Sequence, residues 1–152
     1  MSDNVTPFRR PPKRPVAPQQ SGGMGFKTHR GKVVLAHLLT IGAFTLNLIF
    51  GAPPLAYIGT GVGVAAGFFV YSNRGAAMPW ANTHHEHAMR TLIFGYSIWV
   101  LASALTLING ALLTITVYIQ LAVAIWALIR ALIALVLGVM RRPVPHPHGW
   151  LI

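Results

Sequence analysis

A chain of 152 residues in which 54% are apolar and only 9% are charged lies outside the usual balance for a soluble domain. Its formal charge of +10 comes from twelve Lys and Arg side chains against two acids, Asp3 and Glu86. Seven of the twelve basic residues lie within residues 1–32, which indicates a basic tail and not a basic folded surface. The chain has no cysteine, which excludes disulfides, thiolate metal sites and thiol nucleophiles.

The N-terminal segment, residues 1–32, is rich in Pro, Gly, Gln and Arg and has no apolar periodicity. We expect a disordered cytoplasmic tail whose basic side chains attract anionic lipid headgroups. Arg9–Pro15 also fits the pattern that polyproline-binding domains accept. Nucleic acid is not an expected partner, because Phe8 and Phe26 are the only aromatic residues beside these charges. The first apolar run begins at Val33, too late for a signal peptide.

Four apolar segments follow the tail. They cover residues 33–50, 55–71, 91–108 and 111–129. A membrane span needs about 20 residues, at about 1.5 Å each, to cross a hydrocarbon core of about 30 Å. The sequence therefore predicts an all-α integral membrane protein, with four transmembrane helices arranged as two helical hairpins in residues 33–140.

The fourth segment continues to residue 140 and contains Arg130. Counted from Ala111, Arg130 is the twentieth residue, where a straight span would just have left the hydrocarbon core. We expect residues 111–129 to cross and the remainder to form a tilted or interfacial extension, with Arg130 reaching to the boundary. Residues 141–152 form a Pro-rich C-terminal tail in which Trp150 can return to the interface.

Loop charge predicts the orientation. The turns at 51–54 and 109–110 are uncharged, whereas both tails and the 72–90 loop are basic. The positive-inside rule then places both termini and the 72–90 loop in the cytoplasm. The residues expected at the membrane interface are Trp80, Arg90, Arg130, Arg141 and Arg142.

The stretch THHEHAMRT, residues 83–91, combines three histidines with one of the two acids. Thr83 and Glu86 have the spacing of a helix capping box, in which each side chain bonds a backbone N–H at the helix start. The third helix would then begin around His84 and enter lipid near Thr91.

A metal site is a less favoured interpretation of the same stretch. His84 and His87 are three residues apart and share a helix face. They would need further ligands from the other histidines, and the sequence does not show which converge: His29, His37, His146 or His148. Proton or quinone chemistry is a further alternative for these imidazoles. No cofactor is predicted.

Three glycines in the second apolar segment, Gly59, Gly63 and Gly67, recur at every fourth position. They lie inside an apolar span with no strand before them, which argues against a dinucleotide-binding loop. Instead they form a small-residue face that lets another helix approach closely, within the monomer or between copies.

Several uncharged polar residues occur at membrane depth, of which Asn47 and Gln120 are two. Gln120 is nearest the middle of its span and is costly to leave without a partner. Hydrogen bonds between helices are the favoured interpretation, and lining of a permeation path is the alternative.

The order of several motifs resembles a known family. The features are His84 at a polar helix start, Arg90-Thr91 opening a span, Ile125–Arg130 closing the last span, and Arg142-Pro143-x-Pro145 after a short extension. In these the chain is similar, from about Leu55 to Ile152, to small bacterial four-helix membrane proteins of unknown function. Those proteins are distantly like the chloroplast inner-envelope import component Tic-twenty. The resemblance implies a four-helix inner-membrane fold and, through the plant relatives, a link to protein translocation.

The favoured function is a non-enzymatic integral inner-membrane protein that packs within a homo-oligomer or a larger membrane complex. A channel or protein-translocation component is the alternative, and a histidine-based metal- or haem-binding membrane subunit is the third. An enzyme is the least supported class, because Glu86 is the sole acid of the predicted folded part.

Overall fold

The computed structural model describes residues 25–51, 54 and 56–150. These residues form four α-helices and contain no strand. The helices are α1 (His29–Ile49), α2 (Ala56–Asn73), α3 (Pro79–Ile108) and α4 (Leu113–Val139), with a short 3-10 turn, η1 (Gly110–Leu112), before the last. The all-α prediction is confirmed. Residues 1–24 of the predicted tail and residues 151–152 lie outside the described residues.

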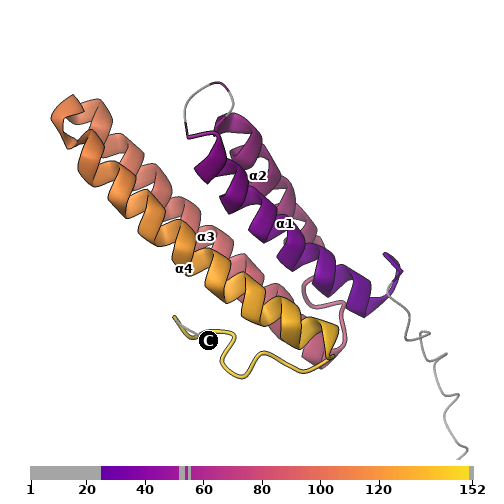
Figure 1. The fold of residues 1–152 in the computed structure, drawn as a ribbon. Coiled ribbons are helices and arrows are strands. Elements are labelled where there is room, and N and C mark those ends of the chain that lie inside the picture. Colours follow the sequence, from indigo (N-terminus) through magenta and orange to yellow (C-terminus); the bar gives the residue numbers. More distant parts are fainter. Residues whose placement is uncertain (1–24, 52–53, 55, 151–152) are drawn as a thin grey trace, which may run out of the picture.

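The four helices pack as two pairs that meet along α1 and α4. Figure 1 shows α1 beside α2 and α3 beside α4. The core at the junction contains Phe44 of α1, Ala66 of α2 and Leu92 of α3, packed on small residues of α4 such as Ala124 and Ala127. Small side chains at these positions let the α4 backbone approach its neighbours closely.

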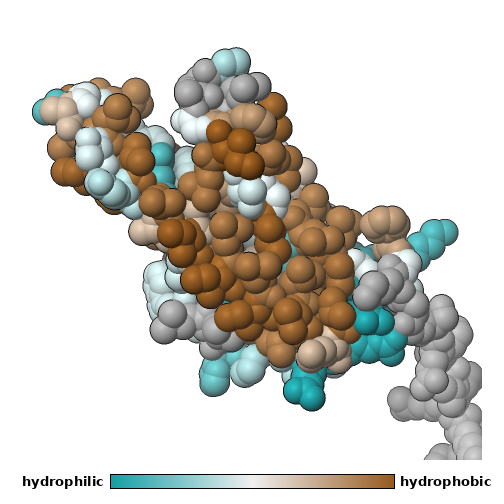
Figure 2. All heavy atoms as spheres, viewed as in Figure 1, coloured by the Kyte–Doolittle hydropathy of each residue, from teal (hydrophilic) through white to brown (hydrophobic). Residues whose placement is uncertain are grey.

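The two pairs lie close together at one end of the molecule and diverge toward the other. The C-terminal segment lies at the closed end, and the C-terminal ends of α1 and α3 lie at the open end (Figure 1). Figure 2 shows these helix ends standing apart, with apolar residues over the helices and hydrophilic residues at the closed end. On this face the most hydrophilic surface therefore lies where the helix pairs are packed together (Figure 2).

Two helices begin earlier than the apolar pattern predicted. The Oγ1 atom of Thr28 accepts the Gly31 N–H at 3.1 Å and caps α1, so the helix starts at His29. Helix α3 starts at Pro79, whose fixed φ suits the first turn of a helix, and its N-cap is Met78. Most of the predicted 72–90 loop is therefore helical. The capping-box prediction for Thr83 and Glu86 is wrong, because both lie inside α3.

Three helices are long and apolar enough to cross a membrane: α1, α3 and the continuous stretch Gly110–Val139. This finding supports a membrane protein. Helix α3 has 30 residues, so it is about 45 Å long and exceeds a hydrocarbon core of about 30 Å. Helix α4 runs through Arg130 to Val139 without a break, which agrees with the helical extension expected beyond residue 129.

The glycine face of α2 is used mainly inside the chain. A Cβ atom on Gly59 would meet Asn47 of α1, and one on Gly63 would meet the phenol of Tyr96 on α3. The same groups bond each other, because Asn47 Nδ2 donates to Tyr96 Oη at 3.0 Å and Tyr96 Oη donates to the Gly59 carbonyl at 3.0 Å. A Cβ atom on Gly67 would meet nothing within 4 Å. Two of the three glycines therefore join α2 to α1 and α3.

Polar side chains in the α3 and α4 spans bond each other across the helix pair. Gln120 Nε2 donates to Ser103 Oγ at 2.9 Å. Thr106 Oγ1 donates to Thr116 Oγ1 at 2.8 Å, and Thr116 in turn donates to the Ala102 carbonyl at 2.9 Å. These bonds join α3 to α4 and give Gln120 the helix-to-helix partner that the sequence indicated.

We expect the substitution Gly63→Ala to destabilise the fold and the matched Gly67→Ala to leave it intact. The added methyl at position 63 would strike a tyrosine ring that two hydrogen bonds hold in place. Overpacking of this kind costs about 1–3 kcal/mol. Thermal unfolding in detergent would measure the difference, and equal melting temperatures for the two variants would contradict this packing.

Candidate functional site

Arg130 is the centre of the polar end of the molecule. Its side chain is only 2% exposed. The Nε atom donates to Thr91 Oγ1 at 3.2 Å and NH2 donates to His87 Nδ1 at 3.1 Å, both on α3. NH1 donates to the Gly149 carbonyl of the C-terminal segment at 2.8 Å. The side chain therefore does not reach outward as predicted, because α3 and the returning chain supply its partners within the fold.

An aromatic contact completes the surroundings of Arg130. Its guanidinium carbon lies 5.1 Å from the ring centre of Trp126, one helical turn earlier on α4. The Trp126 indole Nε1 donates to the Trp150 carbonyl at 2.9 Å, and the Trp150 ring packs on Phe94 at 4.7 Å between centroids. Arg130 and Trp126 thus both bind the backbone of the C-terminal segment.

A left-handed residue turns the chain back at the end of α4. Arg141 has φ of 57°, and its N–H donates to the Gly138 carbonyl at 3.1 Å. The Arg142 N–H donates to the Leu137 carbonyl at 2.9 Å, so the pair satisfies the last carbonyls of the helix as a Schellman motif does. A non-glycine residue in this conformation costs about 1–2 kcal/mol, which the contacts of the returning segment offset.

The returning segment is anchored on the first turns of α3. The His84 Nε2 atom donates to the Arg142 carbonyl at 2.8 Å. The Val144 N–H donates to Thr83 Oγ1 at 3.0 Å, and the Val144 side chain is only 2% exposed. Thr83 and His84 therefore hold the C-terminal segment, and neither acts at a helix start.

Four histidines are buried at this end: His37 on α1 and His84, His85 and His87 on α3. His37 Nε2 and His84 Nδ1 are 3.0 Å apart. Because His84 donates through Nε2 to a carbonyl, its neutral ring accepts through Nδ1, and His37 is the donor in the pair. This bond ties α1 to α3, and the Trp80 ring meets His84 edge-on at 5.9 Å.

Within residues 25–51, 54 and 56–150, no group of three or more histidines or acids is arranged to hold a metal ion. His37 does approach His84, but both ring nitrogens of His84 are already in hydrogen bonds. Nδ1 of His87 accepts from Arg130. His146 and His148 lie exposed on the C-terminal segment. The two histidines predicted as ligands thus have other partners, the Arg142 carbonyl for His84 and Arg130 for His87, and His37 is the further candidate that bonds His84.

Glu86 lies between two arginines on the outer side of α3. Its Oε2 is 2.8 Å from Arg74 Nε, and its Oε1 is 3.1 Å from Arg90 Nε. His148 Nδ1 is 3.9 Å from the same Oε1 atom. The carboxylate therefore joins the α2–α3 turn, α3 and the C-terminal segment, instead of the backbone N–H predicted for it.

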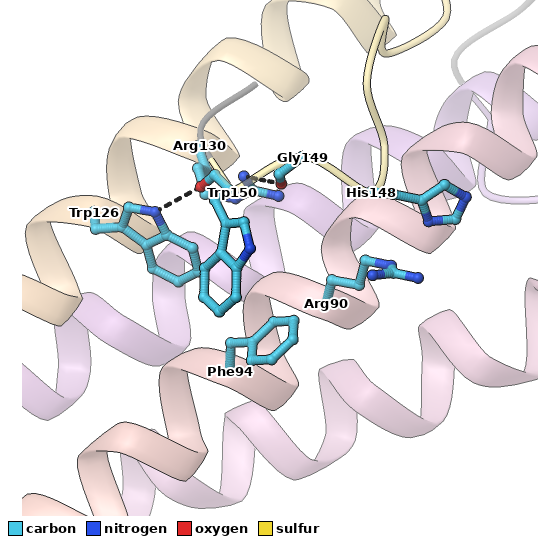
Figure 3. Close-up of a pocket in the computed structure, with 7 residues that line it drawn as sticks. All are labelled: Arg90, Phe94, Trp126, Arg130, His148, Gly149 and Trp150. Atoms are coloured by element: carbon cyan, nitrogen blue, oxygen red, sulfur yellow. Dashed lines mark hydrogen bonds between the residues drawn. The ribbon is translucent and has the colours of Figure 1, made fainter.

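A cavity of about 230 Å³ lies beside Arg130. Its lining comes from α3, α4 and the C-terminal segment: Arg90, Phe94, Trp126, Arg130, His148, Gly149 and Trp150 (Figure 3). Figure 3 shows the Trp150 ring between Trp126 and Phe94, with Arg90 and His148 to one side. The site therefore combines cationic and aromatic groups around one hollow.

Sequence reasoning missed Phe94 and Trp126 as site residues. Each lies four positions from an arginine that was predicted at the interface, Arg90 and Arg130 respectively. Residues four apart share a helix face, so this spacing was a usable signal. The sequence indicated that Trp150 can return to the interface, but no comparable signal places its ring on Phe94, because that contact depends on the path of a non-helical segment.

The comparisons with known proteins give no match. No family model, curated protein or solved structure matches the chain. The relation to Tic-twenty-like membrane proteins therefore stays a prediction from sequence.

We expect Thr83→Val to loosen the C-terminal segment locally, whereas Thr83→Ser retains the hydroxyl and the anchor. The Val144 N–H would lose its acceptor in a buried place. A lost hydrogen bond of this kind is worth about 1 kcal/mol, or about a fivefold faster amide exchange. Hydrogen exchange at Val144 measures the effect, and unchanged exchange in the valine variant would show that Thr83 is not an anchor.

Proposed function

We propose that this chain is a non-enzymatic integral inner-membrane protein that acts by packing within a homo-oligomer or a larger membrane complex. The observation that carries the proposal is the division of the surface: apolar residues cover the helices, and polar groups gather at one end (Figure 2). The polar groups there hold the chain's own C-terminal segment, as Arg130 and His84 illustrate. This division suits a protein that is embedded in a membrane and packs against other chains through its apolar helix faces.

In this proposal α2 is the fourth span, and the two helix pairs are transmembrane hairpins. Helix α2 has 18 residues, so it is about 27 Å long, close to the hydrocarbon thickness of about 30 Å. It packs along α1, which is long enough to cross. The basic closed end then faces the cytoplasm together with both termini.

The outer face of α2 is the surface best suited to assembly. Gly61, Val64, Ala65 and Phe68 are exposed and follow helical spacing on one side of α2. Small residues on a membrane helix allow another helix to approach closely. Since Gly59 and Gly63 are occupied inside the chain, a second copy or another membrane protein would meet this outer face.

Single cysteines in this cysteine-free chain test the spans. Ala76 lies in the turn before α3 and Ala111 in the turn after it, and Gly51 follows α1; all three residues are exposed. We expect an impermeant maleimide outside spheroplasts to label Gly51→Cys and Ala111→Cys, and to label Ala76→Cys only after permeabilisation. Reaction of Ala76→Cys and Ala111→Cys from the same side would show that α3 does not cross.

A photo-crosslinking amino acid in place of Val64 tests the assembly in native membranes, with position 136 as the control. Val64 on α2 is 56% exposed and Val136 on α4 is 54% exposed. We expect an adduct of discrete protein mass from position 64, equal to two chains for a homo-oligomer or different for another partner. Lipid adducts alone at both positions would contradict packing through this face.

A further inference from the structure

Two rows of side chains on α3 and α4 repeat the same chemical order. On α3, Arg90, Phe94 and Ile98 follow one another four residues apart. On α4, which runs the opposite way, the same order is Arg130, Trp126 and Ala122, again four residues apart. The two helices lie side by side (Figure 1). Residues of both rows line the same two cavities, so the rows run next to each other. Cations, then aromatic rings, then aliphatic groups succeed one another away from the closed end.

Two cavities follow these rows. The cavity of about 230 Å³ lies at the level of the arginines. A second cavity, of about 260 Å³, is lined by Ile98, Ala122, Val123, Trp126 and Trp150. Trp126 and Trp150 line both cavities, so a cationic hollow adjoins an apolar one across two indole rings.

The charges around the first cavity favour an anion. Arg90, Arg130 and His148 line it, and no acidic side chain is among its seven lining residues. The nearby carboxylate of Glu86 pairs with the guanidinium groups of Arg74 and Arg90 and lies 3.9 Å from His148 Nδ1. This one carboxylate offsets only part of the charge of three arginines, Arg74, Arg90 and Arg130. A phosphate in the cavity would therefore meet a positive potential, and arginine is the side chain best matched to phosphate geometry.

We propose that the two cavities bind one anionic phospholipid. Its phosphate lies at the level of Arg90 and His148, its glycerol region lies against Trp126 and Trp150, and an acyl chain follows Ile98 and Ala122. The apolar cavity argues for a lipid as the source of the phosphate, because free phosphate has no part that it would cover. Tryptophan rings are enriched at membrane–water interfaces, because they are amphipathic and lie at the level of the lipid headgroups. Trp126 and Trp150 therefore suit the region between phosphate and acyl chain. The inference depends on the membrane embedding proposed above.

The headgroup contact can be tested at Arg90, with Arg74 as the matched control. Both bind Glu86, and their side chains are 37% and 47% exposed, but only Arg90 lines the first cavity. Native mass spectrometry of the purified full chain in an equimolar mixture of phosphatidylglycerol and phosphatidylcholine, with identical acyl chains, would count retained lipid. We expect preferential retention of phosphatidylglycerol, a loss of about fivefold in Arg90→Gln, and little change in Arg74→Gln.

The acyl chain is tested by filling the second cavity. Ala122 and Leu121 are both exposed on α4, but only Ala122 lines that cavity. Ala122→Phe should lower retention of phosphatidylglycerol, and Leu121→Phe should not. Inorganic phosphate at millimolar concentration should fail to displace the lipid.

Three results would overturn the inference. Equal loss of phosphatidylglycerol in Arg74→Gln and Arg90→Gln would indicate general surface charge, and displacement of the lipid by inorganic phosphate would indicate an anion site without a lipid. Equal retention of the two lipids would show that the site does not select an anionic headgroup. Carbonate-resistant membrane association of each variant is measured alongside. Loss of that association in the wild-type chain would refute the proposed membrane function itself, whereas its retention without lipid preference would refute the lipid site alone.

Discussion

A guanidinium taken out of water must find hydrogen-bond acceptors inside the fold, and this requirement organises the closed end of the molecule. Arg130 lies on the most apolar stretch of the chain, yet α3 offers it Thr91 and His87, and the C-terminal segment offers the Gly149 carbonyl. Satisfying one buried cation therefore joins α3, α4 and a segment that would otherwise trail from α4. That segment supplies three of the seven residues that line the first cavity: His148, Gly149 and Trp150.

The histidine-rich stretch of α3 also contacts the other helices at the closed end, and helical spacing places its residues on two faces with different partners. His84, His87 and Thr91 share one face, where they bond His37 of α1, the C-terminal segment and Arg130. Glu86 and Arg90 lie on the neighbouring face and form ion pairs toward the outside. These two turns of helix thus contact α1, α4, the α2–α3 turn and the C-terminal segment, and the imidazoles of His84 and His87 hydrogen-bond across those contacts.

Apolar run lengths were sufficient to predict an all-helical chain and the approximate positions of its helices, because hydrophobic patterning is a local property. The errors came from non-local partners. Thr83 and Glu86 have capping-box spacing, but Pro79 starts the helix earlier, which leaves both side chains for tertiary contacts. Arg130 fits a boundary residue when distance is counted along α4 alone. Its burial could not be predicted, because the path of a proline-rich tail is not encoded in any periodicity.

The central claim is that Arg130 holds the C-terminal segment against α3. Hydrogen exchange of the bilayer-embedded Arg130→Met variant tests it most directly, with amides in the first turns of α4 as an internal check that the helices persist. The account predicts that protection at Val144 and Gly149 collapses in this variant while α4 keeps its protection; both amides are hydrogen-bonded in the wild-type chain. Retained protection at Val144 and Gly149 would show that the segment stays in place without the guanidinium, and would contradict the account.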